Sequence, residues 1–245
     1  MKIIKVNLKF LIIYNTAAPI QNIGAYGVEL SDRFDSLEVV DKTTGQYKKM
    51  NLEDCQFGYR DSFFKRSGQD QYVIVSVNLR LSLKPNICIE YPALKNEIMR
   101  HHMQIEMKHD RNFEDYLTPK MISDIVCFIR RSKLPDPMVA PNAGSFFKNP
   151  IVKSEDLLGL KKLYPDIISY NFCKENMKIS AGYLIEKAGW KCLKRGGVGI
   201  DERQALVLVN LGGSAQDILS LANEIQVSIL EKFGMTLEIE PRVYR

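Results

Sequence analysis

The sequence predicts an α+β fold in two parts, a mainly β part in front and a mixed α and β part behind it. Side chains alternate between apolar and polar over Tyr72 to Leu81, which is typical of a long half-buried strand. After Thr118 the apolar residues recur at helical spacing instead. Leu134-Pro135-Asp136-Pro137 then interrupts the helical pattern and indicates a linker between the parts.

Composition and charge fit this reading and exclude little else. The chain has 245 residues, 45% hydrophobic and 26% charged, as in an ordinary globular protein of one large or two modest domains. The net charge of +5 is small and the basic residues are scattered, so we expect no nucleic-acid binding. The five cysteines are widely spaced and contain no C-x-x-C pair, which favours reduced thiols in a cytosolic protein.

The first sixteen residues form an untypical N-terminal segment. Lysines precede the apolar run Phe10 to Ile13, as they do in a signal peptide. That run is too short to span a membrane, and no small-residue cleavage site follows cleanly. No other segment approaches eighteen apolar residues, so we expect a cytoplasmic protein that does not bind a membrane.

In the front part, Ser36 to Val40 and Gln46 to Met50 flank the turn Asp41 to Gly45 and predict a hairpin. The stretch from Leu94 to Tyr116 is rich in Met and Lys, contains all the histidines and reads as a polar surface insertion. On a helix, His102, Glu106 and His109 would share one face and could in principle hold a metal. We expect no metal site there, since the polar surface reading explains the segment.

Behind the insertion, Thr118 can cap a helix that starts at Pro119, and Leu134-Pro135 ends it. Its apolar stripe consists of Met121, Ile122, Ile125, Val126 and Ile129. Ser154 opens a further helix through Leu163 that Pro165 ends, and Ser180 opens another that Gly189 closes.

The last part contains a short apolar run, Ala205 to Val209, which predicts an interior strand. Ser214 with Asp217 forms a capping box for the final helix, which Gly234 terminates. Its buried stripe is Ile218, Leu221, Ala222, Ile225 and Ile229. A terminal strand from Thr236 to Tyr244 would carry Glu238, Glu240 and Arg242 on one face, which indicates either solvent exposure or a site.

The nonapeptide Pro141 to Asn149 is the most informative stretch. Its Asn-Ala-Gly turn allows close approach of a ligand to the backbone and presents the hydroxyl of Ser145 at the apex. Phe146 and Phe147 anchor the turn, and Lys148 and Asn149 follow at a spacing that can face anionic and carbonyl groups. A buried Phe-Phe pair that leaves an ordinary polar turn is the alternative.

An ordered set of motifs resembles the UDP-N-acetylenolpyruvoylglucosamine reductase family. The motifs are Pro19 to Gly27, Gly58 to Ser62, Asn142 to Pro150 and Leu237 to Arg242. Lys133 to Pro137, Ser180 to Gly182 and Gln204 to Leu206 also look like family positions, so the resemblance runs from about Ala17 to Arg242. Tyr91 places it with the family's first subgroup, which carries a tyrosine on a loop over the substrate.

The resemblance implies reduction of UDP-N-acetylenolpyruvoylglucosamine to UDP-N-acetylmuramate in peptidoglycan synthesis, with FAD and NADPH as cofactors. NADPH reduces FAD, and the flavin passes the hydride to the enolpyruvyl double bond. Ser145 matches the proton donor, and Arg60 and Glu240 match the pair that stabilises the enolic intermediate. The alternatives are a surface salt bridge between Arg60 and Asp61, and Glu238 in place of Glu240.

Binding residues are implied in the same way. Lys133 and Asn149 match positions that hold the uridine diphosphate, Gln204 matches a further substrate contact, and Tyr59 and Tyr91 accompany the substrate. The expected cofactor contacts come from the backbone of a flavin-binding lobe, at Gln21, Asn22, Gly24 and Gly27.

The implied domains are a mainly β remnant of a two-lobed FAD-binding domain at 17–132, with the insertion at about 94–116, and an α/β substrate-binding domain at 133–234. Residues 235–245 form the terminal strand with the catalytic glutamate. The family's first flavin-binding lobe, with its glycine-rich phosphate loop, has no counterpart in this sequence, so we expect weak FAD binding. A non-catalytic chain that at most binds UDP-sugars therefore stays open beside the reductase.

Overall fold

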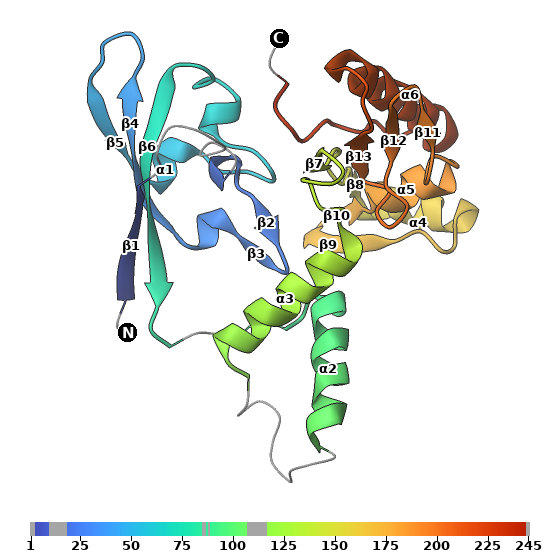
Figure 1. Ribbon diagram of the computed structural model, residues 1–245, viewed down its shortest axis with the longest axis horizontal. Coiled ribbons are helices and arrows are strands. Elements are labelled where there is room, and N and C mark those ends of the chain that lie inside the picture. Colours follow the sequence, from blue (N-terminus) through green and yellow to red (C-terminus); the bar gives the residue numbers. More distant parts are fainter. Residues whose placement is uncertain (1–2, 10–18, 85–86, 88, 107–116, 244–245) are drawn as a thin grey trace. The chain divides into compact units, whose positions relative to one another are not determined.

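The computed structural model describes residues 3–9, 19–84, 87, 89–106 and 117–243. The chain contains helices and antiparallel sheets and divides into two compact units, Met1–Ile129 and Arg130–Arg245 (Figure 1). The α+β class predicted from the sequence is therefore confirmed. The division falls inside a helix, a few residues before the expected boundary at Lys133.

The first unit is built on a four-stranded antiparallel sheet in the order β1-β6-β4-β5 (Figure 1). Its strands are β1 (Ile3–Lys9), β4 (Phe34–Asp41), β5 (Tyr47–Met50) and β6 (Tyr72–Ser82). The predicted hairpin is confirmed as β4 and β5. Its turn is closed by Asp41, whose carboxylate accepts from the amides of Thr43 and Thr44 at 2.8 and 2.9 Å.

Strand β1 corrects the reading of the N-terminal segment. It pairs with β6 from Ile3 opposite Ser82 to Lys9 opposite Ser76. Apolar and polar residues alternate from Ile4 to Lys9, a strand signal that the comparison with a signal peptide obscured. The segment 1–16 therefore contains a strand that the sequence reading did not include, and the apolar run Phe10 to Ile13 lies outside the described residues.

The core of the first unit lies against one face of this sheet. Short elements surround it: β2 (Gly24–Ala25), β3 (Val28–Glu29), α1 (Leu52–Cys55) and the single 3-10 turns η1 (Pro19–Gln21), η2 (Leu30–Asp32) and η3 (Phe63–Lys65). The buried residues of this core are Ile20, Phe34, Leu37, Val39, Met50, Cys55, Ile74 and Val77.

Helices α2 (Pro92–Glu106) and α3 (Pro119–Lys133) follow. Leu94 and Ile98 of α2 are buried against Ile125 and Ile129 of α3, so the start of the expected polar insertion is a packed helix. The surface reading is wrong there, because Leu94 and Ile98 recur at helical spacing. His101 and His102 belong to α2, and His109 lies outside the described residues.

Helix α3 begins and ends as predicted. The hydroxyl of Thr118 accepts from the amide of Met121 at 3.2 Å, and the last helical residue is Lys133. Ile125 and Ile129 of its predicted stripe are buried.

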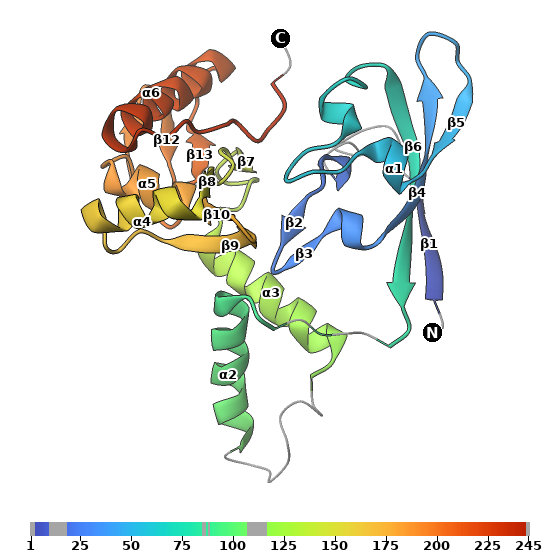
Figure 2. The same cartoon turned by 180° about the vertical axis from the view of Figure 1, so that it is seen from behind.

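The second unit contains two antiparallel sheets and three helices (Figures 1 and 2). One sheet has the order β8-β10-β9, and the other has the order β11-β12-β13-β7. Their strands are β7 (Asn142–Ser145), β8 (Ile151–Lys153), β9 (Ser169–Cys173), β10 (Asn176–Ile179), β11 (Lys194–Arg195), β12 (Val198–Ile200) and β13 (Val207–Asn210). The helices are α4 (Ser154–Leu163), α5 (Ala181–Lys187) and α6 (Ala215–Phe233).

Most of the predicted elements of this unit are present. Ser214 and Asp217 form the capping box of α6, and Gly234 ends the helix with φ +66°. Leu221, Ala222, Ile225 and Ile229 of α6 are buried in the core of this unit. The predicted interior strand is β13, which starts at Val207 and has β12 and β7 on its two sides.

Both predicted helices are present, but only α5 is capped by the predicted serine. Ser180 caps α5 and accepts from the amide of Tyr183 at 3.2 Å. Helix α4 has the predicted bounds, but Ser154 is its first helical residue and Lys153 occupies the cap position without a side-chain bond.

Two backbone segments touch at Gly197 and Gly213. The carbonyl of Gly197 accepts from the amides of Leu211 and Gly213 at 2.7 and 2.9 Å. A Cβ at Gly197 would lie 2.7 Å from the nitrogen of Gly213, and a Cβ at Gly213 would lie 2.9 Å from the carbonyl oxygen of Gly197. The turn before β12 and the loop before α6 are therefore packed backbone against backbone.

Candidate functional site

Ser145 lies at the end of β7 and not at the apex of a free turn. Its partner across the sheet is Val207, and the amide of Phe146 donates to the carbonyl of Leu206 at 2.8 Å. The pairing shifts between Val207 and Val209, and Gly144 has φ +73°. The Asn-Ala-Gly segment is thus a bulged strand, and this corrects the predicted turn. The bulge leaves Ser145 exposed on a backbone that the sheet holds in place.

The two phenylalanines behind Ser145 anchor the strand, as the sequence predicted. Phe146 and Phe147 are 6% and 1% exposed and belong to the core of the second unit. Their rings meet edge to face with centroids 5.5 Å apart.

The terminal segment pairs with the residues that follow Ser145. The amide of Lys148 donates to the carbonyl of Glu238, and the amide of Glu240 donates to the carbonyl of Phe146, both at 2.9 Å. One isolated bridge joins Phe147 and Ile239, so the predicted regular strand Thr236 to Tyr244 is wrong in extent. Tyr244 lies outside the described residues. The structure nevertheless places the backbone of Glu240 beside the residue next to Ser145.

Alternate side chains of this segment enter the core. Leu237 is fully buried and Ile239 packs against the same core, so Glu238 and Glu240 fall on the opposite side. Glu238 forms an ion pair with the ammonium of Lys148, whose side chain is only 10% exposed. The charge of Lys148 is therefore paired within the protein, and its contact with a ligand stays a prediction.

Asn149 and Gln204 hold the loops around Ser145. The side-chain oxygen of Asn149 accepts from the amide of Ala181 at the start of α5, at 2.9 Å. The side-chain oxygen of Gln204 accepts from the amide of Leu206 at 3.3 Å. Lys133 is exposed at the last residue of α3. Within the part of the chain that the structure describes, no hydrogen bond is recorded from Lys133 to these residues.

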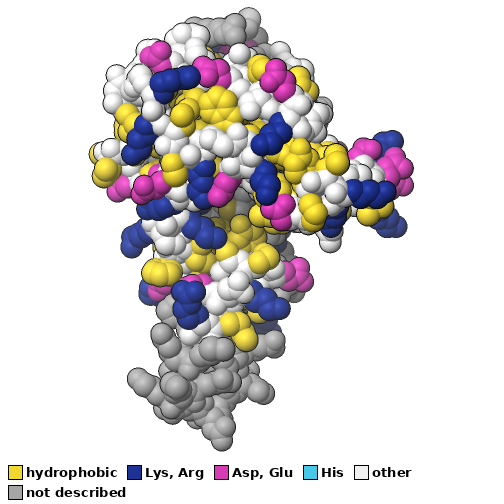
Figure 3. All heavy atoms as spheres, turned by 90° about the vertical axis from the view of Figure 1, so that its right-hand side faces the viewer, with side chains coloured by type: hydrophobic (Ala, Val, Ile, Leu, Met, Phe, Trp, Pro, Cys, Tyr) yellow, Lys and Arg dark blue, Asp and Glu magenta, His cyan; other side chains and the backbone are white. Residues whose placement is uncertain are grey.

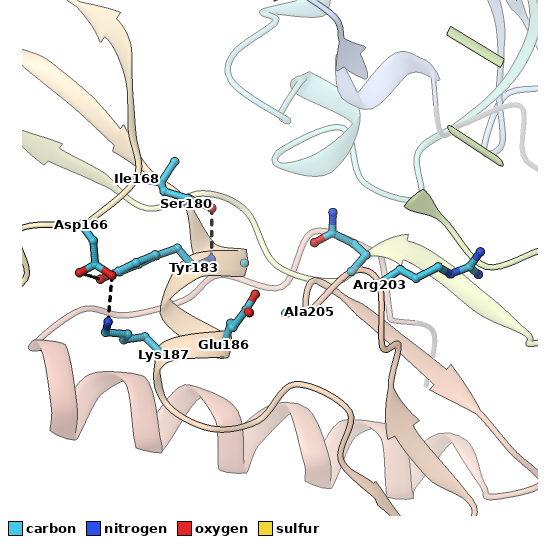
Figure 4. A pocket seen from close by; sticks show the side chains of 10 residues that line it. Asp166, Ile168, Ser180, Tyr183, Glu186, Lys187, Arg203 and Ala205 are labelled. Carbon is cyan, nitrogen blue, oxygen red and sulfur yellow. Dashed lines mark hydrogen bonds and ion pairs between the residues drawn. The ribbon is translucent and has the colours of Figure 1, made fainter. Parts of the chain in front are cut away.

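A hollow of about 480 Å³ adjoins Gln204 (Figure 4). On one side, the carboxylate of Asp166 accepts from the hydroxyl of Tyr183 at 2.8 Å and from the ammonium of Lys187 at 2.9 Å. These two hydrogen bonds lower the pKa of Asp166, while burial and the same carboxylate raise the pKa of Tyr183 to about 12. The lining residues are Asp166, Ile168, Ser180, Gly182, Tyr183, Glu186, Lys187, Arg203, Gln204 and Ala205.

Arg60 belongs to the first unit and occupies a tight turn. The amide and carbonyl groups of Gly58 and Asp61 bond each other at 2.9 and 3.2 Å, which places Tyr59 and Arg60 at the tip. Arg60 has φ +51°, and the ring centroid of Tyr59 lies 5.2 Å from its guanidinium carbon. The turn therefore presents both expected residues together.

The partners of Arg60 differ from the salt bridge considered as an alternative. Its guanidinium pairs with Glu29 at 3.4 Å and donates to the carbonyls of Asn22, at 3.3 Å, and of Gly24. Asp61 pairs with Arg66 instead. The ion pairs that the structure shows here are thus Arg60 with Glu29 and Arg66 with Asp61.

Of the four residues expected to contact a flavin, Asn22 has its side chain engaged inside the protein. It is 2% exposed and bonds Glu29, the carbonyl of Gly58 and the amide of Ser31. Gly24 and Gly27 belong to the β2–β3 hairpin, whose turn residues Tyr26 and Gly27 have φ +54° and +83°. The amide group of Asn22 is therefore engaged within the protein, and contact of this hairpin's backbone with a flavin stays a prediction.

Tyr91 packs edge to face on Tyr26, with ring centroids 5.0 Å apart. It lies just before α2 and is 38% exposed, so the expected loop tyrosine is tied to the hairpin. Glu29 was not predicted as a functional residue, because its contact with Arg60 joins positions far apart in the sequence. The sequence indicates only that Arg60 needs an acidic partner, and Asp61 is closer to it in the sequence than Glu29 is.

The surface is mixed in charge. In Figure 3 basic and acidic side chains alternate over the face drawn, with hydrophobic groups between them, and no single-sign stripe covers it. Among the described residues, no group of three or more His, Cys, Asp or Glu side chains could hold a metal ion. No helix in the described part of the chain is both long and apolar enough to cross a membrane.

The fold is that of an α+β protein in which Ser145 and Glu240 lie on hydrogen-bonded backbone segments and a separate hollow adjoins Gln204. Residues 136–244 match the model of the C-terminal domain of UDP-N-acetylenolpyruvoylglucosamine reductase. The reductase of Paraburkholderia phytofirmans is 46% identical over 227 residues, which cover 92% of this chain and 63% of that protein. The reductase of Pseudomonas syringae pv. tomato is 43% identical over 229 residues, 93% of this chain and 64% of that protein.

The family resemblance seen in the motifs is thus confirmed, and the chain is a relative of the UDP-N-acetylenolpyruvoylglucosamine reductases. It spans about 63% of the length of the curated relatives that it matches. The crystal structure of the reductase from Thermus caldophilus has the same fold, with a TM-score of 0.54 and 24% identity. That match covers 94% of this chain and 59% of the other.

Proposed function

We propose that this chain takes part in the reduction of UDP-N-acetylenolpyruvoylglucosamine to UDP-N-acetylmuramate, in the cytoplasm and with FAD and NADPH. The names of its relatives support the reaction, and one observation in the structure carries the assignment to residues. The amide of Glu240 donates to the carbonyl of Phe146, so two residues that the reaction requires together lie on neighbouring backbones. In this proposal 17–132 form part of a FAD-binding domain, 133–234 form the substrate-binding domain, and 235–245 carry the catalytic glutamate.

The chemistry assigns a role to each charged or protic group. Bound FAD would supply the hydride, received from NADPH, for the terminal carbon of the enolpyruvyl group. As the new C–H bond forms, the electrons of the double bond move toward the carboxylate. Arg60 and Glu240 stabilise this developing enolic charge, and the hydroxyl of Ser145 gives its proton to the adjacent carbon. Hydride and proton together saturate the double bond.

Ser145 is well placed to donate a proton because its backbone is fixed on two sides. Strand β13 holds Ser145 through Val207, and the terminal segment holds the next residue. A positioned acid contributes far more than a mobile one, since the orientation is set before the reaction starts. A serine hydroxyl is a weak acid, so this orientation is part of its activation.

The remaining residues are proposed to bind. Lys133 and Asn149 contact the diphosphate and the uridine, Gln204 makes a further substrate contact, and Tyr59 and Tyr91 line the substrate. The backbone at Gln21, Asn22, Gly24 and Gly27 contacts the flavin.

The test is an anaerobic assay of the purified chain with NADPH, with and without the enolpyruvyl UDP-sugar, after the visible spectrum has been recorded. Once FAD is added, we expect substrate-dependent oxidation of NADPH. A protein that takes up added FAD but does not convert the UDP-sugar contradicts the proposal.

A second candidate is a chain that binds UDP-sugars without catalysis. The second unit favours it, because it has its own buried core and carries Ser145, Asn149, Gln204 and Glu240, whereas Arg60 belongs to the other unit. Separate calorimetric titrations with FAD and with the UDP-sugar distinguish the two functions. Binding of the UDP-sugar with no measurable binding of FAD identifies the second candidate.

A further inference from the structure

We propose that Asn22 and Glu29 are positioning residues that hold the guanidinium of Arg60 in one orientation, ready to receive the carboxylate of the substrate. The inference rests on the proposed function of Arg60. Asn22 was expected to contact the flavin through its backbone only, and Glu29 was assigned no role. Their side chains and Arg60 form what we call the arginine clamp.

Asn22 is the centre of the clamp. Its side-chain nitrogen donates to Glu29 at 2.8 Å and to the carbonyl of Gly58 at 2.9 Å, and its side-chain oxygen accepts from the amide of Ser31 at 3.0 Å. With 2% exposure it joins the loop that carries Arg60, through Gly58, to the loop that carries Glu29. A buried amide with three such bonds fixes the separation of the segments that it connects.

Glu29 connects Asn22 to the guanidinium of Arg60. One carboxylate oxygen accepts from Asn22, and the other pairs with Arg60 at 3.4 Å. The backbone carbonyls of Asn22 and Gly24 accept from the same guanidinium. A planar guanidinium with acceptors in more than one direction has a defined orientation, which a single ion pair would not provide.

The space around the guanidinium is closed at Gly24. A Cβ on Gly24 would lie 2.8 Å from a terminal nitrogen of Arg60 and 2.8 Å from the Cγ of Glu29. Both groups therefore lie close to the backbone of the hairpin, which leaves no room for a side chain at position 24.

The backbone of Arg60 indicates that the clamp has a function. A tip residue with φ +51° is ordinarily Gly or Asn, and a side chain as long as that of arginine is uncommon there. Such conformations persist where the surroundings hold them, and they occur preferentially at binding sites. The side chain of Arg60 keeps 18% of its surface exposed, through which an anion can reach it.

The first measurement tests how firmly the clamp holds Arg60 and does not require turnover. Phenylglyoxal, which modifies accessible guanidinium groups, is applied to the full chain, and the rates at Arg60 and at the exposed Arg33 are followed by peptide mass spectrometry. We expect Glu29→Gln and Asn22→Ala to raise the rate at Arg60 severalfold relative to Arg33. Asp61→Asn is the matched control, because Asp61 lies next to Arg60 in sequence but pairs with Arg66. Equal rates in the wild type and both variants overturn the proposal.

Glu29→Gln also separates positioning from folding. Glutamine keeps the shape and an acceptor for Asn22, and the side chain of Glu29 is 37% exposed, so this variant should fold even where Asn22→Ala does not. Thermal melting checks each variant. A faster reaction at Arg60 in a Glu29→Gln protein with unchanged melting supports the clamp.

The second measurement tests its purpose by rapid kinetics of the two half-reactions. We expect Glu29→Gln to lower the maximal rate of substrate reduction at least tenfold, with a smaller change in substrate affinity and no change in flavin reduction. Glu29→Asp should recover part of the rate because it restores the charge. Parallel losses in both half-reactions overturn the positioning role. A wild-type chain with no turnover overturns the proposed function instead, and the modification rates then still decide whether the clamp exists.

Discussion

The surroundings of Ser145 and of Arg60 are built in different ways. The strand that carries Ser145 pairs with β13 through backbone hydrogen bonds. The terminal segment with Glu240 pairs with the residues that follow Ser145, and both segments pack on the same core. Arg60 lies in a turn and is held by the side chains of Asn22 and Glu29 and by nearby carbonyls. Backbone bonds survive most substitutions, whereas side-chain bonds depend on residue identity. The first region should therefore lose chemistry without losing structure, and the second should lose both together.

The largest expected effect is that of Ser145→Ala. Its side chain is exposed and its strand is held by backbone bonds, so the fold should be unchanged. The second half-reaction should slow by about 10²–10⁴-fold, because the proton donor is lost. Stopped-flow measurement of flavin reduction by NADPH is the internal control, and equal losses in both half-reactions would falsify the assignment.

Glu240→Gln should reduce turnover by about 10²–10³-fold, the usual effect of removing one group that stabilises a transition-state charge. Glu238→Gln is the matched control on the same side of the segment. Because Glu238 pairs with the nearly buried Lys148, that variant should cost about 1 kcal/mol of unfolding free energy and little turnover. Greater damage to turnover from Glu238→Gln would mean that the two glutamates have been assigned in the wrong order.

Gly24→Ala should disturb the Arg60 region more than any conservative change in the Ser145 region. The new methyl would lie 2.8 Å from Arg60 and Glu29, and such overpacking costs about 1–3 kcal/mol. In the control Gly58→Ala, the nearest atom is the Cβ of Asp61 at 3.7 Å, an ordinary contact. Urea unfolding of both variants makes the measurement, and a Gly24→Ala protein as stable as the control contradicts the packing around Arg60.

The smallest effect is expected from Asp166→Asn, which removes a side-chain interaction at the surface of the second unit. The hydrogen bonds from Lys187 and Tyr183 lower the pKa of Asp166 below its unfolded value of about 3.9. Its contribution to stability is thus present above pH of about 4 and is lost as the pH falls through the folded pKa. Unfolding curves at pH 7 and pH 3 should show the variant less stable at pH 7 and closer to the wild type at pH 3. If the difference in unfolding free energy between the variant and the wild type is the same at both pH values, the carboxylate of Asp166 does not titrate between pH 3 and pH 7.

Local signals predicted the elements that local interactions determine. The capping box of α6, the capping threonine of α3 and the Asp41 turn between β4 and β5 all lie within a few residues of the structure that they specify. The alternating pattern of strand β1 was missed because its lysines suggested a signal peptide. The β9–β10 hairpin was also not predicted.

Contacts between distant segments could not be predicted. The motif around Ser145 was correct in its residues, but the bulge of β7 depends on pairing with β13, more than fifty residues later. Arg60 was matched to Asp61 because that carboxylate is adjacent in sequence, whereas its partner Glu29 is 31 residues away. Lys148 likewise was expected to face a ligand, whereas its ammonium pairs with Glu238, which lies 90 residues further along the chain.

The contact between Gly197 and Gly213 restricts how this chain can diverge. Any side chain at either position would place its first carbon within 3 Å of the other segment's backbone, so both single-step routes away from glycine are blocked. Replacing both at once would add two methyl groups to the same gap, so a second mutation cannot rescue the first. During neutral drift both positions should therefore remain glycine. A mutagenesis library for this protein would contain fewer unfolded variants if both codons were left unchanged.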